Sequence, residues 1–298
     1  MNNLYLNISK PRKDVKKILG QANHFLITIL VGLDYIKRND TDLPNEFRTS
    51  WNPKDKIRSV LRSREYALNS SLAWAVDCLD AYFSKINQSP FLIEDNELKM
   101  NIDGCRRSVY EKYNIFSNYI ISDKSNTKDF ILYKSFVDLA IQWRNNTTHY
   151  NAENVLLKES ENFFKTYSDA IKEEFCGLKI DETLERFKKG LSPTFKEVTS
   201  LIRAIHKYIE LLDSFLLNKL DIEKYAYGLL KKFFTENVNE KNLYPTLKKE
   251  RQIIKIYNIL RSLSFCDNKV ENGICLPNST INEINEKLMK AYSQKQHI

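Results

Sequence analysis

Apolar residues recur at helical spacing along almost the whole chain. One series covers residues 15–33 and a second covers residues 61–86, mostly with steps of three or four residues. Such steps place side chains on one face of a helix, whereas a strand would alternate them. Only seven glycines and seven prolines interrupt 298 residues, too few for the turns of a β-sandwich or barrel. The sequence therefore predicts an all-α protein.

Further apolar stripes predict where the other helices lie. These helices cover residues 109–120, 133–143, 156–175, 198–215, 222–233, 253–263 and 281–291. The segment 177–193 holds two of the seven glycines, a proline and many charges, which favours a domain boundary. We therefore expect an N-terminal amphipathic helix within residues 1–50 that packs on the bundle, an up-down helical bundle at 51–180, and a second helical domain at 190–298.

The charge balance favours a polyanionic partner without requiring one. Lysine and arginine number 46 against 38 acidic residues, a net charge of +8. Because lysine far outnumbers arginine, part of this excess is equally explained by general composition. The residues that could follow an RNA backbone or stack on its bases are residues 10–17, Arg58, Arg62, Arg64, Arg106, Arg107, Lys248, Lys249, Arg251, Tyr66, Tyr110 and Tyr150.

Cysteine usage and hydropathy predict a cytoplasmic protein. The five cysteines are scattered and include no Cys-x-x-Cys pair, which fits reduced thiols better than disulfides or a zinc site. The longest apolar run, residues 25–33, is too short to cross a bilayer. We expect no metal, no cofactor and no membrane partner.

One polar stretch at the end of a predicted helix stands out. Residues 143–150 read WRNNTTHY, although asparagine and threonine are poor helix formers. The stretch places Arg144 five positions before His149, with Asn145 directly after the arginine. His24, His206 and His297 lack such neighbours and are expected to be structural or incidental.

Arginine and histidine are the residue types that RNA cleavage without a metal requires. The ribose 2′-OH must attack its own phosphate, so one group must move protons and one must balance charge on the phosphoryl oxygens. His149 can act as the acid or base, and the planar guanidinium of Arg144 suits phosphate. Asn145 could orient the histidine or donate to phosphate, and Asn146 and Tyr150 are candidate substrate contacts.

The Arg144-Asn145-x-x-x-His149 pattern at a bundle helix resembles the HEPN superfamily, whose motif is an arginine, four to six residues and a histidine. The resemblance covers roughly residues 51–176. It implies a metal-independent endoribonuclease, often a toxin or an antiphage-defence effector, that acts as a homodimer with a composite site. It also implies an antitoxin or trigger protein as a further partner. A related branch has one residue between the histidine and a modified tyrosine, whereas Tyr150 follows His149 directly.

Helical geometry leaves two arrangements open for this pair. On an unbroken helix, residues five apart point about 140° from each other. Either the Asn-Asn-Thr-Thr stretch breaks the helix, or a second copy of the chain supplies the complementary residue.

Three interpretations without catalysis are also consistent with the sequence. In the first, Asn145 and Asn146 merely end a helix, Asn151 caps the next one, and Arg144 and His149 are solvated. In the second, the chain is an inactive HEPN-like module that binds RNA, a nucleotide or a protein. In the third, it is a helical scaffold or regulator.

Overall fold

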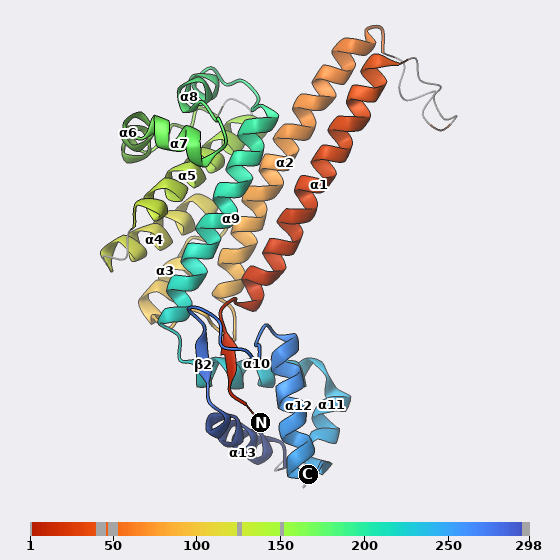
Figure 1. Ribbon diagram of the computed structural model, residues 1–298, viewed down its shortest axis with the longest axis vertical. Coiled ribbons are helices and arrows are strands. Elements are labelled where there is room, and N and C mark those ends of the chain that lie inside the picture. Colours follow the sequence, from red (N-terminus) through yellow and green to blue (C-terminus); the bar gives the residue numbers. More distant parts are fainter. Residues whose placement is uncertain (1, 40–45, 47–52, 124–126, 150–151, 294–298) are drawn as a thin grey trace. The chain divides into compact units, whose positions relative to one another are not determined.

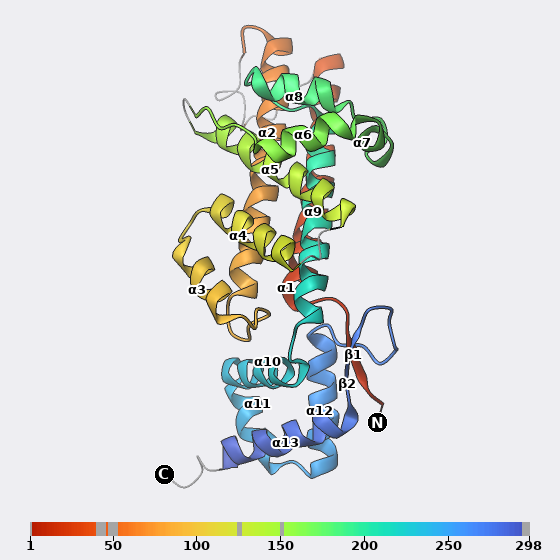
Figure 2. The ribbon, with the colours of Figure 1, turned by 90° about the vertical axis from the view of Figure 1, so that its left-hand side faces the viewer.

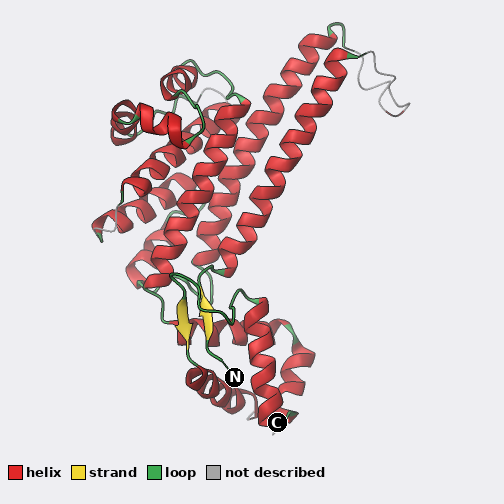
Figure 3. Cartoon of the chain, viewed as in Figure 1, coloured by secondary structure: helices red, strands yellow, loops and turns green. Residues whose placement is uncertain are grey.

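The computed structural model describes residues 2–39, 46, 53–123, 127–149 and 152–293 (Figure 1). These residues form thirteen α-helices, and 76% of the structure is helical. Figure 3 shows that helices dominate and that two short strands are the exception. The prediction of an all-α protein is confirmed.

The chain folds into two compact units, and each draws on separated segments. Unit 1 contains residues 1–14, 81–107 and 210–298, and unit 2 contains residues 15–80 and 108–209. The division crosses three helices: α1 (Lys10–Arg38), α2 (Lys56–Ile86) and α9 (Phe195–Asn218). The units therefore alternate along the chain, whereas the predicted domains follow chain order.

Unit 2 holds most of α1, α2 and α9 together with five further helices. These are α4 (Val109–Ser122), α5 (Lys128–Thr148), α6 (Lys158–Thr166), α7 (Ser168–Glu174) and α8 (Ile180–Lys188). Aromatic side chains fill its interior. Phe136 on α5 lies with its ring centroid 5.0 Å from that of Phe164 and 4.3 Å from that of Phe175. Helix α5 is thus the central element of this unit, buried along most of its length.

One expectation for unit 2 was wrong. The single helix expected over 156–175 is two helices, α6 and α7, because the backbone at Tyr167 is not helical. Thr166 and Ser168 flank this break, and such residues favour helix ends. The segment 177–193 contains α8, whose Ile180, Leu184 and Phe187 are buried.

Unit 1 combines the two ends of the chain. Its helices are α3 (Asn96–Gly104), α10 (Ile222–Glu236), α11 (Val238–Leu243), α12 (Lys249–Ser262) and α13 (Asn278–Ser293). All five are labelled in Figure 2. A short 3-10 helix spans Tyr244–Thr246. Strand β1 (Leu4–Leu6) pairs antiparallel with β2 (Ile274–Leu276), with Tyr5 opposite Cys275.

A buried carboxylate fixes the N-terminal segment within unit 1. Asp213 is fully buried and accepts hydrogen bonds from the backbone N–H and the hydroxyl of Ser9. It also accepts the hydroxyl of Tyr82 at 3.0 Å. Burial raises the pKa of the Asp213 carboxyl. Because a buried polar group is costly unless it is hydrogen-bonded, these donors tie three distant segments to one point.

Candidate functional site

The candidate site lies at the C-terminal end of α5. The last buried residue of this helix is Trp143, whose indole N–H donates to the carbonyl of Leu191 at 3.0 Å. Its ring meets Phe187 of α8 edge to face, with the centroids 5.8 Å apart. Trp143 therefore fixes the position from which the polar stretch leaves the core.

The helix continues through Thr147 and Thr148, and the hydroxyls of both residues bond back to carbonyls of the preceding turn. Thr147 Oγ1 donates to the carbonyl of Trp143 at 3.0 Å, and Thr148 Oγ1 donates to that of Arg144 at 2.8 Å. Both carbonyls lie within α5 and already accept the backbone N–H groups four residues further on, so the hydroxyl bonds are additional to the helical ones. The helix ends at His149, whose backbone is extended and whose N–H donates to the Asn145 carbonyl at 3.1 Å.

This continuity excludes one of the arrangements left open by the sequence. A helix break within Asn-Asn-Thr-Thr is wrong, and so is the reading that Asn145 and Asn146 end the helix, because α5 extends to Thr148. Asn151 and Tyr150 lie outside the described residues.

Arg144 is half-buried, and its guanidinium contacts an acid on α2. Its Nη2 donates to Asp77 Oδ1 at 3.2 Å, and its Nη1 donates to Asn145 Oδ1 at 3.1 Å. Its Nε is buried and has no hydrogen-bond partner among the described residues. Asn145 therefore orients the arginine in this structure, and the described contacts of Arg144 do not run to His149.

Asn146 closes a clasp with Asn154 around the segment that contains His149. Asn146 Oδ1 accepts the backbone N–H of Asn154 at 2.7 Å and its side-chain Nδ2 at 3.0 Å. Asn146 Nδ2 donates to the Asn154 carbonyl at 3.0 Å. Both ends of the Asn146 amide are thus engaged, which assigns this residue to holding the chain.

A buried acid about two turns before Asn146 fixes the same segment. Asp138 is fully buried on α5, and its Oδ2 accepts the backbone N–H of Leu157 at 2.9 Å. Burial raises the pKa of the Asp138 carboxyl, although the Leu157 N–H opposes this shift. The chain that follows His149 is therefore attached to α5 at Asn154 and at Leu157.

His149, directly after the last residue of α5, is exposed to solvent. Its position gives the imidazole access to an external substrate, while the arginine one turn earlier is anchored. His24 on α1 is also exposed, His206 on α9 is half-buried, and His297 lies outside the described residues.

The basic and aromatic residues that the sequence offered for RNA contact are spread over several helices in both units. Arg58, Arg62 and Tyr66 lie on α2, and Tyr110 lies on α4, all in unit 2. The clusters at residues 106–107 and 248–251 belong to unit 1. Burial is the main cause that raises the pKa of Tyr110, and the carboxylate of Asp138 on α5 raises it further.

The cysteines, the acidic and histidine side chains, and the long helices bear on whether the chain meets the requirements of a disulfide, a metal site or a membrane span. The five cysteines are free thiols. Within the described ranges, no three His, Cys, Asp or Glu side chains form a group that could hold a metal ion. Among the helices that the structure describes, none is both long and apolar enough to span a membrane.

Sequence reasoning did not find two residues of this site. Asp77 lies 67 residues before Arg144, and no local pattern signals that the two are paired. Asn154 falls in a stretch without helical periodicity, where its only signal is the propensity of asparagine to bond backbone groups. No protein-family model, curated protein or solved structure matches this chain.

Proposed function

We propose that this chain is a metal-independent endoribonuclease in which Arg144 and His149 carry the chemistry. The observation that carries the proposal is an exposed histidine placed directly after α5, with an anchored arginine one turn earlier on the same helix. The resemblance of this motif to the HEPN superfamily points to the same activity. The free thiols and the positive net charge fit a cytoplasmic protein that acts on RNA.

The reaction transfers a phosphoryl group within the RNA. The ribose 2′-oxygen attacks the adjacent phosphorus, the bond from phosphorus to the 5′-oxygen breaks, and a 2′,3′-cyclic phosphate and a 5′-hydroxyl result. An imidazole exchanges protons near neutral pH, so His149 takes the 2′-OH proton or gives one to the leaving oxygen. Arg144 stabilises the charge that builds up on the phosphoryl oxygens.

Arg144 can exchange its present partner for phosphate. Asp77 holds only one guanidinium nitrogen, and its carboxylate is 65% exposed. An exposed ion pair is worth less than about 1 kcal/mol, whereas a phosphate can engage two nitrogens of the fork at once. Asn145 keeps the guanidinium oriented through Nη1 during this exchange.

The arginine and the histidine of one active site come from two copies of the chain. Because α5 is unbroken from Arg144 to Thr148, the arginine and the histidine do not share a helix face. A homodimer with a twofold axis at this site would place the His149 of one copy beside the Arg144 of the other. An antitoxin or trigger protein, and a role in phage defence, are further parts of this proposal that rest on the family resemblance.

The test is cleavage of labelled total RNA in EDTA by wild type, His149→Ala and Arg144→Ala. Both variants should lose at least about a hundredfold in rate, and the wild-type products should end in 2′,3′-cyclic phosphate. His24→Ala removes another exposed histidine of unit 2 and serves as the matched control. It should cleave as wild type does. Full activity of His149→Ala would refute the proposal.

The same experiment separates the ribonuclease from an inactive module. If no variant cuts RNA but wild type and His149→Ala bind it equally in a salt-sensitive way, the chain is a binding module. If wild type neither cuts nor binds RNA, the scaffold reading replaces both.

A further inference from the structure

Helix α1 exposes more apolar surface than a solvent-facing helix normally does. Over residues 18–36 its only acidic or basic side chains are Asp34 and His24. Phe25 is 60% exposed and Val31 is 64% exposed. A helix that is apolar on most sides is normally covered, and contiguous apolar patches mark interaction sites.

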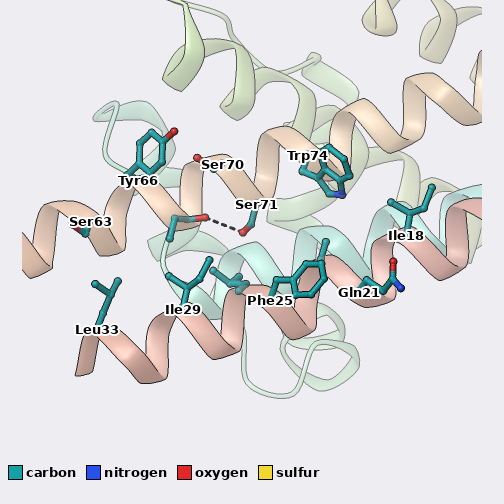
Figure 4. Close-up of a pocket in the computed structure, with 13 residues that line it drawn as sticks. Ile18, Gln21, Phe25, Ile29, Leu33, Ser63, Tyr66, Ser70, Ser71 and Trp74 are labelled. Carbon is teal, nitrogen blue, oxygen red and sulfur yellow. Dashed lines mark hydrogen bonds between the residues drawn. The ribbon is translucent and has the colours of Figure 1, made fainter. Parts of the chain in front are cut away.

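Part of this surface borders a groove between α1 and α2 within unit 2. The groove has a volume of about 630 Å³, and its walls are mainly apolar. Figure 4 shows Phe25 and Ile29 extending from α1 toward α2, with Trp74 on the opposite helix. We call this feature the α1–α2 groove, and its main apolar lining residues are Phe25, Ile29, Leu33, Tyr66, Ala67 and Trp74.

The two helical segments that line the α1–α2 groove carry more basic than acidic residues. Residues 16–38 and 56–74 contain eight lysines and arginines but only two carboxylates, Asp34 and Glu65. Arg62 lies one helical turn before Tyr66 on α2, and Lys37 lies one turn after Leu33 on α1. Asp34 is already paired with Arg64, whose Nη1 lies 3.3 Å from Asp34 Oδ1. An apolar floor with a basic rim therefore remains for an occupant.

This charge pattern selects the occupant. A second copy that docked through the same face would bring its own basic rim against this one, and like charges across an interface are unfavourable. An acidic helix would be attracted instead. Helix-in-groove recognition uses apolar anchors at spacings of three and four residues. From Ile18 to Leu33 the groove wall is about 22 Å long, which matches a helix of about 15 residues.

We propose that the α1–α2 groove binds the apolar face of an amphipathic helix with acidic flanks, supplied by a partner protein. The occupant places its apolar side chains against Phe25 and Trp74, and its carboxylates face Arg62 and Lys37. This interaction goes beyond the proposed ribonuclease activity and does not depend on it.

The test uses a synthetic 18-residue peptide with leucine at positions i, i+3, i+4 and i+7 and glutamate on both flanks. Its affinity for the full chain is measured by fluorescence anisotropy. A second peptide replaces each glutamate by lysine, and a third scrambles the acidic sequence so that no apolar face forms. We expect the acidic amphipathic peptide to bind at least about tenfold more tightly than either control.

Three variants locate the binding. Phe25→Asp should weaken the acidic peptide at least about tenfold, because it places a charge in the apolar floor. The double variant Arg62→Glu with Lys37→Glu should reverse the preference toward the lysine peptide. Val238→Asp introduces the same charge on α11, where the valine is 58% exposed, and should leave the affinity unchanged. Circular dichroism confirms that each variant is folded.

Two other occupants would give different results, and each would overturn the proposal. If wild type sediments as a dimer that Phe25→Asp converts to a monomer, a second copy covers the groove. If vesicles of phosphatidylcholine and phosphatidylglycerol bind the chain through Phe25 while the acidic peptide shows no preference, the groove contacts lipid. Equal binding of all three peptides would also refute it.

Discussion

Replacing Asn146 by alanine removes the clasp that holds the chain on both sides of His149. The change deletes three hydrogen bonds to Asn154, of 2.7, 3.0 and 3.0 Å. At a net value of about 1 kcal/mol each, their loss costs about 3 kcal/mol. Alanine is a better helix former than asparagine by roughly 0.6 kcal/mol, which offsets part of that loss. The expected decrease in the free energy of unfolding is therefore about 2 kcal/mol.

Asn154→Ala provides a matched comparison on the other side of the clasp. It removes only the bond from Nδ2, since the other two bonds use the backbone of residue 154. It lies outside a helix, so no gain in helix propensity applies. We expect a loss of about 1 kcal/mol, roughly half that of the Asn146 variant.

Urea denaturation followed by far-UV circular dichroism measures both values. Hydrogen exchange at the Asn154 amide gives a local readout that does not require the two units to unfold together. This amide should exchange faster in Asn146→Ala and only slightly faster in Asn154→Ala. The reasoning fails if the Asn154 variant is the more destabilised of the two, or if the amide keeps its protection in Asn146→Ala.

Three further changes test the surroundings of the site. Asp77→Asn should tighten RNA binding about two- to fivefold at low salt, because it releases Arg144 from an exposed ion pair. Its stability should not change measurably. Unchanged RNA affinity in a salt titration would contradict this. Burial and the neighbouring Asp77 raise the pKa of Cys78 to about 11, so iodoacetamide at pH 8 should label exposed Cys176 and spare Cys78, as mass spectrometry can show. The pKa of Asp138 is raised by burial, so the folded state keeps this proton to higher pH than the unfolded chain does. Wild type should therefore lose stability relative to Asp138→Asn as the pH rises from about 4 through the raised pKa, and a pH-independent difference would refute this.

The long helices were predictable because one face of each is buried over several turns. Helices α2 and α9 follow their apolar stripes closely. Helix α8 was not recognised because its few apolar residues alternate with charged ones and a glycine lies close to each of its ends. Strands β1 and β2 have three residues each and pair across about 270 positions, a contact that no local pattern encodes.

The candidate site was predictable only in part, for a similar reason. Arg144 and His149 are neighbours in sequence, so their spacing could be read directly. The partners that fix Arg144 and the following chain, Asp77 and Leu157, are chosen by packing of α5 against other segments. Poor helix propensity suggested a break at Asn145–Thr148, but α5 continues to Thr148, and the hydroxyls of Thr147 and Thr148 bond back to carbonyls of the preceding turn.

The pairing of β1 with β2 sets an order of events during synthesis on the ribosome. Unit 2 is complete in sequence once residue 209 has emerged, whereas β1 must wait for residues 274–276. At about 5–20 residues per second, the interval lasts several seconds. During that time Leu4 and Leu6, both fully buried in the finished protein, have no strand to pair with. The segment that carries β1 therefore keeps its apolar side chains open to chaperones until β2 has been made.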